Sequence, residues 1–316
     1  MKHLTALLVF ASAIIAAAAN WPARVFAPYM YIGAGDHFQL TDCDDACGQK
    51  YYTIAFIIAD QQNEPAWDGR FSLNQNYYGD QIDAIRKRGG DVIVSFGGQA
   101  GTELAIAETN LTVLEAKYQS VIDRFKLTWL DFDIEDEGIF DQHANERRNV
   151  VLAKLQAKNP GLTISYTLPV DPNGLNQVTK DLLTDAKVKG VKVHSGNFMI
   201  MWFGPKFNKD RKMIDLCTAS ALKAHEQCQK IDPAIQIGLT ALIGKNERRG
   251  EVFTQNDGKA LVQWVEDKPW VCGLSFWASN RDAGKPAGKR TGNTATGIPQ
   301  QPWEFTRIFQ PFTSNR

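Results

Sequence analysis

Three acidic side chains at alternate positions carry the clearest chemical signal in this 316-residue sequence. Residues 127–138 read Leu-Thr-Trp-Leu-Asp-Phe-Asp-Ile-Glu-Asp-Glu-Gly, which places acids at Asp131, Asp133 and Glu135. Successive side chains of a β-strand point to opposite faces, so the three acids share one face and the apolar residues between them share the other. Burying three carboxyl groups together costs free energy unless some are protonated or paired, so we interpret them as catalytic groups.

The acid segment has two other interpretations, a solvent-facing edge strand and a metal site. A strand at the edge of an antiparallel sheet can turn a polar face to solvent, but both faces of a parallel sheet are covered. Oxygen-rich clusters also bind magnesium or calcium. We favour catalysis by the carboxyl groups themselves, with no metal ion and no other cofactor.

The rest of the chain predicts the scaffold that positions this segment. Short runs rich in β-branched and aromatic residues alternate with stretches of helical periodicity, as in 145–158, 213–230 and 258–266. Such alternation predicts a parallel sheet, and eight strand–helix units predict a single α/β barrel of the (β/α)8 or TIM type, with its active site at the carboxyl ends of the strands. The eight expected strands are 25–29, 53–58, 91–96, 129–135, 162–168, 198–202, 237–243 and 271–277.

The charge balance and the first residues suggest where the protein works. Lys and Arg number 35, as do Asp and Glu, so the formal net charge is zero and nothing points to nucleic acid or an anionic membrane as a partner. The chain begins Met-Lys-His, continues with an apolar run from Leu4 to Ala19, and ends that run in small residues. This pattern is typical of a secretory signal peptide, so we expect residues 1–19 to be removed and the protein to be secreted as a soluble extracellular monomer.

Five cysteines and a polar tail complete the expectations from the residues. Cys43 and Cys47 lie close together in a polar segment, where a local disulfide can form. Cys217 and Cys228 fall eleven residues apart on one expected helix, roughly 16 Å at the helical rise, so we expect buried thiols rather than a bond. The Gly- and Pro-rich tail after Asp282 is expected to wrap the barrel end or to be partly disordered.

The acid segment also resembles a known signature. Asp-Phe-Asp-Ile-Glu at 131–135 is similar to the end of the DxxDxDxE motif of glycoside hydrolase family 18, and Thr at 128 matches the bacterial-type, single-domain chitinase branch. Further segments resemble that family in the same order: Phe-Ala-Pro-Tyr at 26–29, Ser-Phe-Gly-Gly at 95–98, Ser-Tyr-Thr-Leu-Pro at 165–169 and Ser-Phe-Trp at 275–277. The resemblance implies one catalytic barrel over residues 20–316 that hydrolyses β-1,4-N-acetylglucosamine linkages.

The resemblance also implies roles for individual residues. In this family the N-acetyl oxygen of the sugar attacks its own anomeric carbon, without a protein nucleophile. Glu135 would protonate the leaving oxygen and then activate water, Asp133 would hold the acetamido N–H, and Asp131 would share a proton with Asp133. The terminal Trp277 would form the floor of the sugar site. The other expected contacts to chitin or chitooligosaccharides are Tyr29, Gly97, Gln99, Met201, Trp202 and Asn246.

Two segments depart from the family pattern. Trp202 and Phe203 stand where related chitinases carry an Asp-Tyr pair, and Glu247 stands where they carry Asp. Because Phe has no polar group and Trp has one N–H donor, a polar contact to the reacting sugar is changed or lost. Two further functions therefore stay open beside an active chitinase: a weakened chitin-oligosaccharide-binding protein on the same barrel, and an endo-β-N-acetylglucosaminidase.

Overall fold

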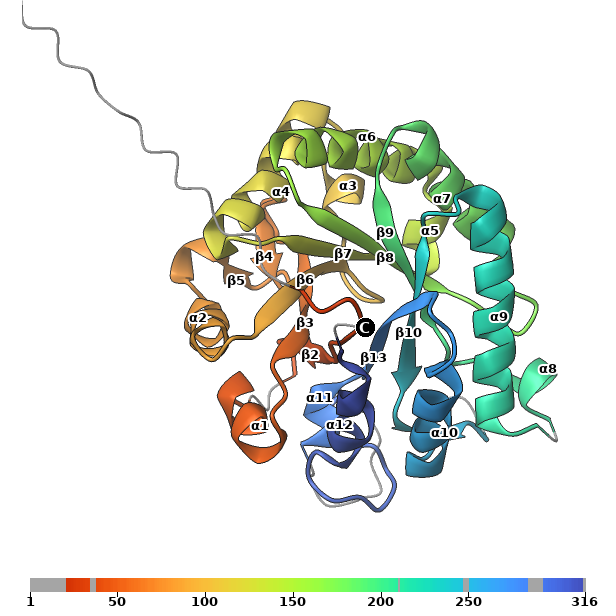
Figure 1. The fold of residues 1–316 in the computed structure, drawn as a ribbon. Helices are drawn as coiled ribbons and strands as arrows, with labels where there is room; N and C mark the ends of the chain where they lie inside the picture. The colour runs from red at the N-terminus through yellow and green to blue at the C-terminus, as the bar shows by residue number, and fades with distance from the viewer. Residues whose placement is uncertain (1–20, 35–37, 210, 247–249, 284–291, 315–316) are drawn as a thin grey trace, which may run out of the picture.

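The chain folds into a closed barrel of parallel strands surrounded by helices (Figure 1). The computed structural model describes residues 21–34, 38–209, 211–246, 250–283 and 292–314. The expected signal peptide, Asn20 and Glu247 lie outside these residues. The barrel strands are β1 (Val25–Phe26), β2 (Tyr29–Tyr31), β3 (Tyr51–Ala59), β6 (Asp91–Gly97), β7 (Trp129–Asp133), β8 (Thr163–Pro169), β9 (Val193–Met199), β10 (Gln236–Leu242) and β13 (Val271–Trp277).

The first barrel strand is divided into two short pieces, and this division closes the ring. β1 pairs in parallel with β13, in the register Val25 to Gly273, and β2 pairs in parallel with β3, in the register Tyr29 to Thr53. From β3 the order continues through β6, β7, β8, β9 and β10 to β13. The single TIM barrel expected from the eight strand-like runs is therefore confirmed.

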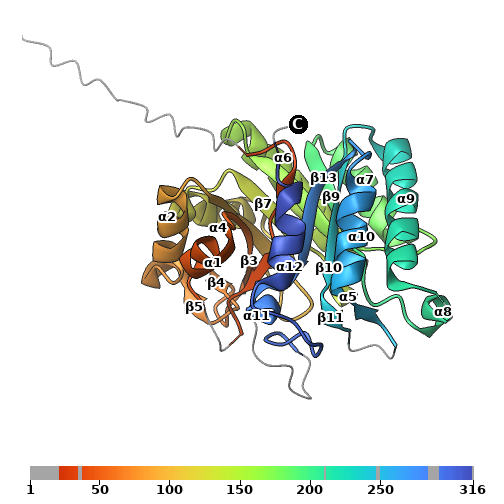
Figure 2. The same cartoon turned by 60° about the horizontal axis from the view of Figure 1, so that its bottom comes forward.

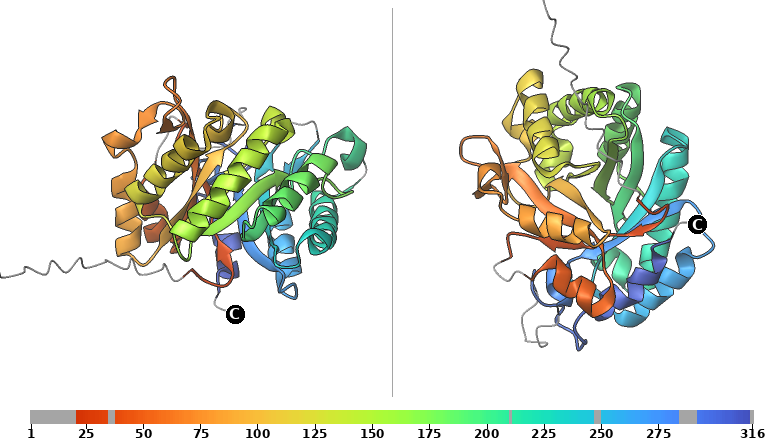
Figure 3. Two further views of the ribbon diagram at one scale, coloured as in Figure 1. Left: turned by 90° about the horizontal axis from the view of Figure 1, so that it is seen from above. Right: turned by 60° about the vertical axis from the view of Figure 1, so that its left-hand side comes forward.

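Helices cover the outside of the barrel, as Figures 1 and 3 show from three sides. The longer ones are α1 (Leu40–Cys47), α2 (Gly79–Lys87), α4 (Leu111–Phe125), α6 (Gln142–Lys158), α7 (Gln177–Val188), α9 (Met213–Ile231), α10 (Gln255–Val265) and α12 (Glu304–Phe309). Short elements lie in the loops: β4 (Pro65–Trp67), β5 (Phe71–Ser72), η1 (Leu73–Gln75), α3 (Leu104–Ala107), α5 (Asp136–Phe140), α8 (Pro205–Asn208), β11 (Gly244–Lys245), β12 (Val252–Phe253), α11 (Ser279–Asp282) and η2 (Gln310–Phe312). No helix in the described part of the chain is long and apolar enough to span a membrane.

The alternation along β7 sorts its side chains as the sequence predicts. Phe132 points outward, stacks on Phe96 of β6 with ring centroids 5.1 Å apart, and meets the edge of Tyr118 on α4. These three aromatic rings are fully buried between the sheet and the helix layer. The apolar set of the strand therefore fills the outer core, and Asp131 and Asp133 are left on the inner face.

Two departures from the expected strand boundaries bear on the site. β7 ends at Asp133, and Glu135 lies just before α5 in an extended conformation. The sixth barrel strand, β9, covers residues 193–199 instead of 198–202. Its first half was missed because Ser195 and Asn197 face the polar barrel interior, where Asn197 bonds Thr167 and Thr240, so no apolar run marks it.

The cysteines are all free thiols. Cys43 and Cys47 lie one turn apart on α1 with their sulfur atoms 3.5 Å apart, so the expected local disulfide is not formed. The segment is a helix rather than a loop, and it ends at Gly48, whose φ of 76° reverses the chain. Cys217 and Cys228 are buried on α9, as the sequence predicts.

The described part of the C-terminal tail, residues 292–314, packs against the barrel as the sequence analysis allowed. Phe305 and Phe309 on α12 are fully buried, and Figure 2 shows this helix beside α10 in the outer layer. The carboxylate of Asp282 accepts hydrogen bonds from the backbone N–H groups of Phe305 and Thr306, which fixes the start of the helix. A few aromatic residues are enough to anchor this segment, because they pack into a core that the barrel and its helices already form.

This arrangement predicts that the tail stabilises the whole domain. Phe309→Ala is expected to lower the free energy of unfolding by about 3–5 kcal/mol, because the ring packs against Phe26, Phe253 and Phe276 and its removal leaves a cavity. Phe140→Ala is the matched control: Phe140 is 67% exposed, and its loss is expected to change stability by no more than about 0.5 kcal/mol. Denaturant unfolding of both variants tests this; equal losses would contradict it.

Candidate active site

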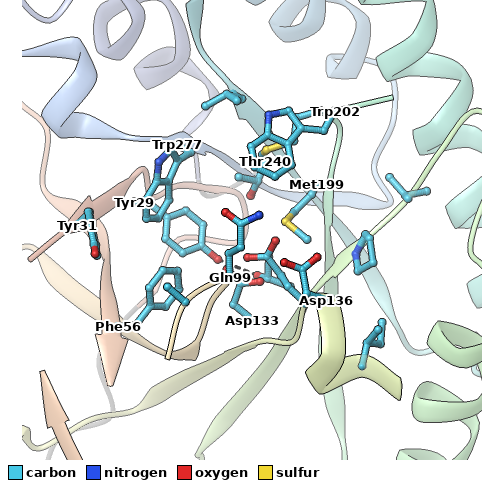
Figure 4. Close-up of a pocket in the computed structure, with 18 of the residues that line it drawn as sticks. Tyr29, Tyr31, Phe56, Gln99, Asp133, Asp136, Met199, Trp202, Thr240 and Trp277 are labelled. Carbon is cyan, nitrogen blue, oxygen red and sulfur yellow. Dashed lines mark hydrogen bonds between the residues drawn. The ribbon is translucent and has the colours of Figure 1, made fainter. Parts of the chain in front are cut away.

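A cavity of about 390 Å³ opens where the barrel strands end (Figure 4). Asp133, Met199, Leu242 and Trp277 are the last residues of β7, β9, β10 and β13, and all four line it. Parallel strands bring their carboxyl ends to one edge of the barrel, which is where such folds place their functional groups. The cavity is thus built by the scaffold, and the loops add to its walls.

Asp131 lies at the bottom of this site, inside the barrel. Its carboxylate accepts hydrogen bonds from four hydroxyl groups, those of Tyr29 at 3.0 Å, Ser95 at 2.8 Å, Ser165 at 2.7 Å and Thr167 at 3.0 Å. Burial raises the pKa of Asp131, and the four hydroxyls act against that rise by stabilising the charged form. A buried carboxylate can therefore persist here without a cation.

Asp133 lies one step closer to the cavity and is 4% exposed. Burial, followed by repulsion from Glu135 and Asp131, raises its pKa well above the usual range. Its Oδ1 atom has no hydrogen-bond partner among the described residues. Asp133 is therefore suited to stay protonated near neutral pH and to bond a polar group that enters the cavity.

Glu135 is half-buried at the cavity wall, directly before α5. Burial raises its pKa to about 7, and the neighbouring carboxylate of Asp136 contributes to the rise. Asp136 is exposed, also lines the cavity, and adopts a left-handed conformation with φ of 42°. A carboxyl group that titrates near neutral pH is suited to give a proton and take it back.

Aromatic rings form the opposite wall. Trp277 stacks on Phe56 with ring centroids 5.6 Å apart and planes 12° apart, and Tyr29 and Tyr31 lie 5.7 Å and 5.3 Å from it. Figure 4 shows these four rings on the same side of Asp133. Such a surface can stack on the apolar face of a sugar ring. Trp277 and Tyr29 were expected from the sequence, whereas Tyr31 and Phe56 had no motif to mark them.

The departures on the sixth strand have separate places in the structure. Trp202 lines the cavity after β9, in a left-handed conformation with φ of 53°, and Met201 lines it next to Trp202. Phe203 is 7% exposed and does not line the cavity. Its backbone N–H donates to the buried carboxylate of Glu251 at 3.1 Å, and the N–H of Gly204 donates to the same carboxylate.

Gly97 and Asn246 were expected to touch a sugar but do not line the cavity, whereas Gln99 does. Gly97 has φ of 95°, and a Cβ atom there would stand 2.3 Å from the carbonyl oxygen of Asp133, so it permits a close backbone approach instead. Asn246 is 7% exposed; its side chain bonds the carbonyl groups of Leu242 and Gly244 and shapes the loop after β10.

Sequence reasoning missed the residues that loops supply. Asp136, Ile139 and Phe140 from α5 line the cavity, as do Thr167 and Asp68. The acidic run Glu-Asp-Glu at 135–137 was the one available signal for Asp136, but side-chain direction after a strand end cannot be read from alternation. Within the described residues, no group of three or more His, Cys, Asp or Glu side chains is arranged to hold a metal ion.

Known proteins similar to this chain include chitinases. The chain is 29% identical over 315 residues to a probable bifunctional chitinase/lysozyme of Escherichia coli (strain K12), and 30% identical over 279 residues to endochitinase 11 of Metarhizium anisopliae. These matches cover 93% and 83% of this chain, and the chain spans 35% and 53% of the two relatives. No protein-family model matches the chain.

A solved structure extends the likeness to the whole barrel. The catalytic domain of a hyperthermophilic chitinase from Pyrococcus furiosus superimposes with a TM-score of 0.83 at 30% identity, over 93% of this chain and 96% of that domain. Fold and site thus define a barrel of the glycoside hydrolase type. The chain belongs to the glycoside hydrolase family 18 chitinases.

The electrostatics of Glu135 and Asp136 lead to a prediction on pH dependence. A general acid must be protonated, so kcat/KM is expected to fall as pH rises through the pKa of Glu135, about 7. In Asp136→Asn the repulsion from a neighbouring negative charge is gone, so the pKa of Glu135 drops and the fall begins at lower pH. The pH profile of kcat/KM for wild type and variant measures this. Glu137→Gln, at an exposed acid that does not line the cavity, is the control, and an unchanged profile in Asp136→Asn would contradict the assignment.

Proposed function

We propose that this protein is a chitinase that hydrolyses β-1,4-N-acetylglucosamine linkages in chitin or chitooligosaccharides, with Glu135 as general acid and then general base. The observation that carries the proposal is a pair of neighbouring carboxyl groups, Asp133 and Glu135, on one cavity wall. Glu135 has a pKa raised to about 7, and beside it the buried Asp133 offers an oxygen without a partner. Opposite them lies the aromatic surface around Trp277.

The proposed reaction uses the acetamido group of the substrate as the nucleophile. A sugar ring stacked on Trp277 turns its N-acetyl group toward Asp133, which bonds the acetamido N–H and orients the carbonyl oxygen toward the anomeric carbon. Glu135 protonates the glycosidic oxygen while that bond breaks and an oxazolinium ion forms. Glu135 then removes a proton from water. The water attacks the anomeric carbon, which opens the oxazolinium ring and leaves the product with retained configuration.

Asp131 is given an electrostatic role. Because four hydroxyl groups hold its carboxylate in place, its position is fixed, and its charge adds to burial and to the repulsion from Glu135 in raising the pKa of Asp133 before the reaction. When Asp133 bonds the acetamido N–H, the proton of Asp133 can move toward Asp131. Catalytic-site variants of the Pyrococcus furiosus domain have been solved in complex with chito-oligosaccharides, which supports this class of substrate for the present barrel.

The proposal includes export from the cell. It rests on the sequence pattern of residues 1–19, a basic start followed by an apolar run and small residues. An extracellular location fits a polymer too large to enter a cell. N-terminal sequencing of the protein recovered from culture medium tests it.

Glu135→Gln is expected to abolish hydrolysis and to leave oligosaccharide binding nearly intact. Gln keeps the shape of the side chain but cannot deliver a proton, and general acid catalysis contributes about 10²–10⁴-fold. Release of a fluorophore from a chitobiose glycoside measures the rate, and calorimetry with a chitin oligomer measures binding. Glu137→Gln is the matched control and should keep wild-type rates. A Glu135→Gln variant with more than about a tenth of the wild-type rate would refute the role.

The binding-protein alternative is favoured by one observation, the presence of Trp202 in the cavity where the family carries Asp. If the alternative holds, wild type binds chitin oligomers and cleaves them very slowly, and Trp202→Asp with Phe203→Tyr raises turnover about tenfold or more. We expect active wild type and a neutral or harmful double change. Removing the indole leaves a void, an added Asp enters a cavity already lined by acids, and a hydroxyl on the buried Phe203 would need a polar partner there. Steady-state rates on one oligomer distinguish the two.

A further inference from the structure

The short helix α5 forms a wall of the cavity that the mechanism above does not use. It begins directly after Glu135 and carries Asp136 at its start and Phe140 at its end, and both residues line the cavity. The ring of Phe140 is 67% exposed, the highest value but one among the large apolar side chains that are exposed in the described residues. An exposed aromatic ring on a cavity wall offers a stacking surface.

This wall lies on the side of the leaving group. In Figure 4, Trp277 and Asp136 stand on opposite sides of Gln99 and Asp133. If the sugar that is attacked stacks on Trp277 and Glu135 protonates the oxygen that leaves, the next sugar continues away from Trp277 and passes α5. That sugar is the one whose ring meets Phe140 and whose substituent at the second carbon comes within reach of Asp136.

The charge on this side is negative and is not balanced nearby. Among the described residues, no Lys, Arg or His lines the cavity, and none forms an ion pair with Asp136. The other exposed side of the cavity differs, because Asp68 there is paired with Arg70 and accepts a hydrogen bond from Tyr31. A carboxylate without a counter-ion, next to an exposed ring, is suited to a cationic sugar.

We propose that the leaving-group side of the cavity selects glucosamine, the N-deacetylated sugar with a protonated amine, so that partially deacetylated chitin is a preferred substrate class. The proposal rests on the function proposed above. The attacked sugar must keep its acetamido group, because that group is the nucleophile, whereas the leaving sugar has no such requirement. Asp136 then pairs with the ammonium group and Phe140 carries the ring.

The experiment digests partially N-acetylated chitosan of known composition at mildly acidic pH and identifies the new chain ends by mass spectrometry. New non-reducing ends report the sugar on the leaving-group side, and new reducing ends report the attacked sugar. For wild type we expect glucosamine at the non-reducing ends to be enriched about fivefold over chance, the size expected of one exposed ion pair. The enrichment should vanish at about 1 M salt, where the Debye length is about 3 Å.

Variants separate the charge from the ring. Asp136→Asn is expected to bring the glucosamine fraction down to chance, and the neighbouring control Glu137→Gln to leave the enrichment as in wild type. Phe140→Ala is expected to slow cleavage of the polymer while the enrichment persists, and Phe140→Tyr to restore the rate. These comparisons are made within one digest, so they do not depend on the overall rate or on the pKa of Glu135.

The outcomes keep this inference apart from the function on which it rests. Chance composition of the non-reducing ends in wild type, or enrichment that survives Asp136→Asn, overturns the selection of glucosamine. Glucosamine among the new reducing ends, or no cleavage at all, overturns the substrate-assisted reaction itself. N-acetylated reducing ends together with enriched, salt-sensitive non-reducing ends support both.

Discussion

The cost of placing three carboxyl groups inside one barrel is the constraint on which the rest of the site depends. Asp131 is almost fully buried and could not stay charged in an apolar core. Four hydroxyl groups from three strands supply the solvation that water would give: Tyr29 on β2, Ser95 on β6, and Ser165 and Thr167 on β8. Burial, with repulsion from Glu135 and Asp131, raises the pKa of Asp133, and burial with the nearby Asp136 brings the pKa of Glu135 to about 7. The burial that makes these carboxyl groups costly also raises the pKa of Asp133 and of Glu135, and the proposed reaction needs both groups protonated at its start.

Closure of the barrel fixes the aromatic wall around Trp277 relative to these acids. β2 does not pair with β13, and the side chain of Asn280 bridges that gap by bonding both the N–H and the carbonyl group of Tyr31, at 2.8 Å and 3.1 Å. The buried guanidinium of Arg281 donates to the carbonyl groups of Ile243 and Lys245, and Asp282 holds the start of α12. The segment after Trp277 thus ties together the first strand, the loop after the seventh strand and the C-terminal helix. Such fixed geometry favours catalysis, because little reorganisation remains for the reaction step.

The cavity is asymmetric, and the asymmetry has a chemical meaning. On one side, four aromatic rings around Trp277 offer an apolar surface, and the only acid, Asp68, is paired with Arg70. On the other side, α5 presents the ring of Phe140 and the carboxylate of Asp136, which forms no ion pair with any residue that the structure describes. A polymer of alternating acetylated and deacetylated sugars could thus be placed by its charges as well as by its shape. Loops after the strands create this difference, which agrees with the general division between a stable scaffold and variable functional loops.

Sequence alone determined the fold class and the strand that carries the acids, because both depend on local periodicity. Alternation along 129–133 is a property of the strand itself, and the recurrence of strand and helix signals requires only near neighbours in the chain. Other features were decided only by the tertiary structure. β9 begins at Val193, although polar side chains that point into the barrel hide its first half in the sequence. Gly97 lets the backbone of Asp133 approach closely, and the carboxylate of Asp282 fixes the start of α12. The stacking of Phe56 on Trp277 is also a result of the tertiary structure. These features depend on contacts between segments far apart in the chain, whose distance and direction exist only once the barrel has closed.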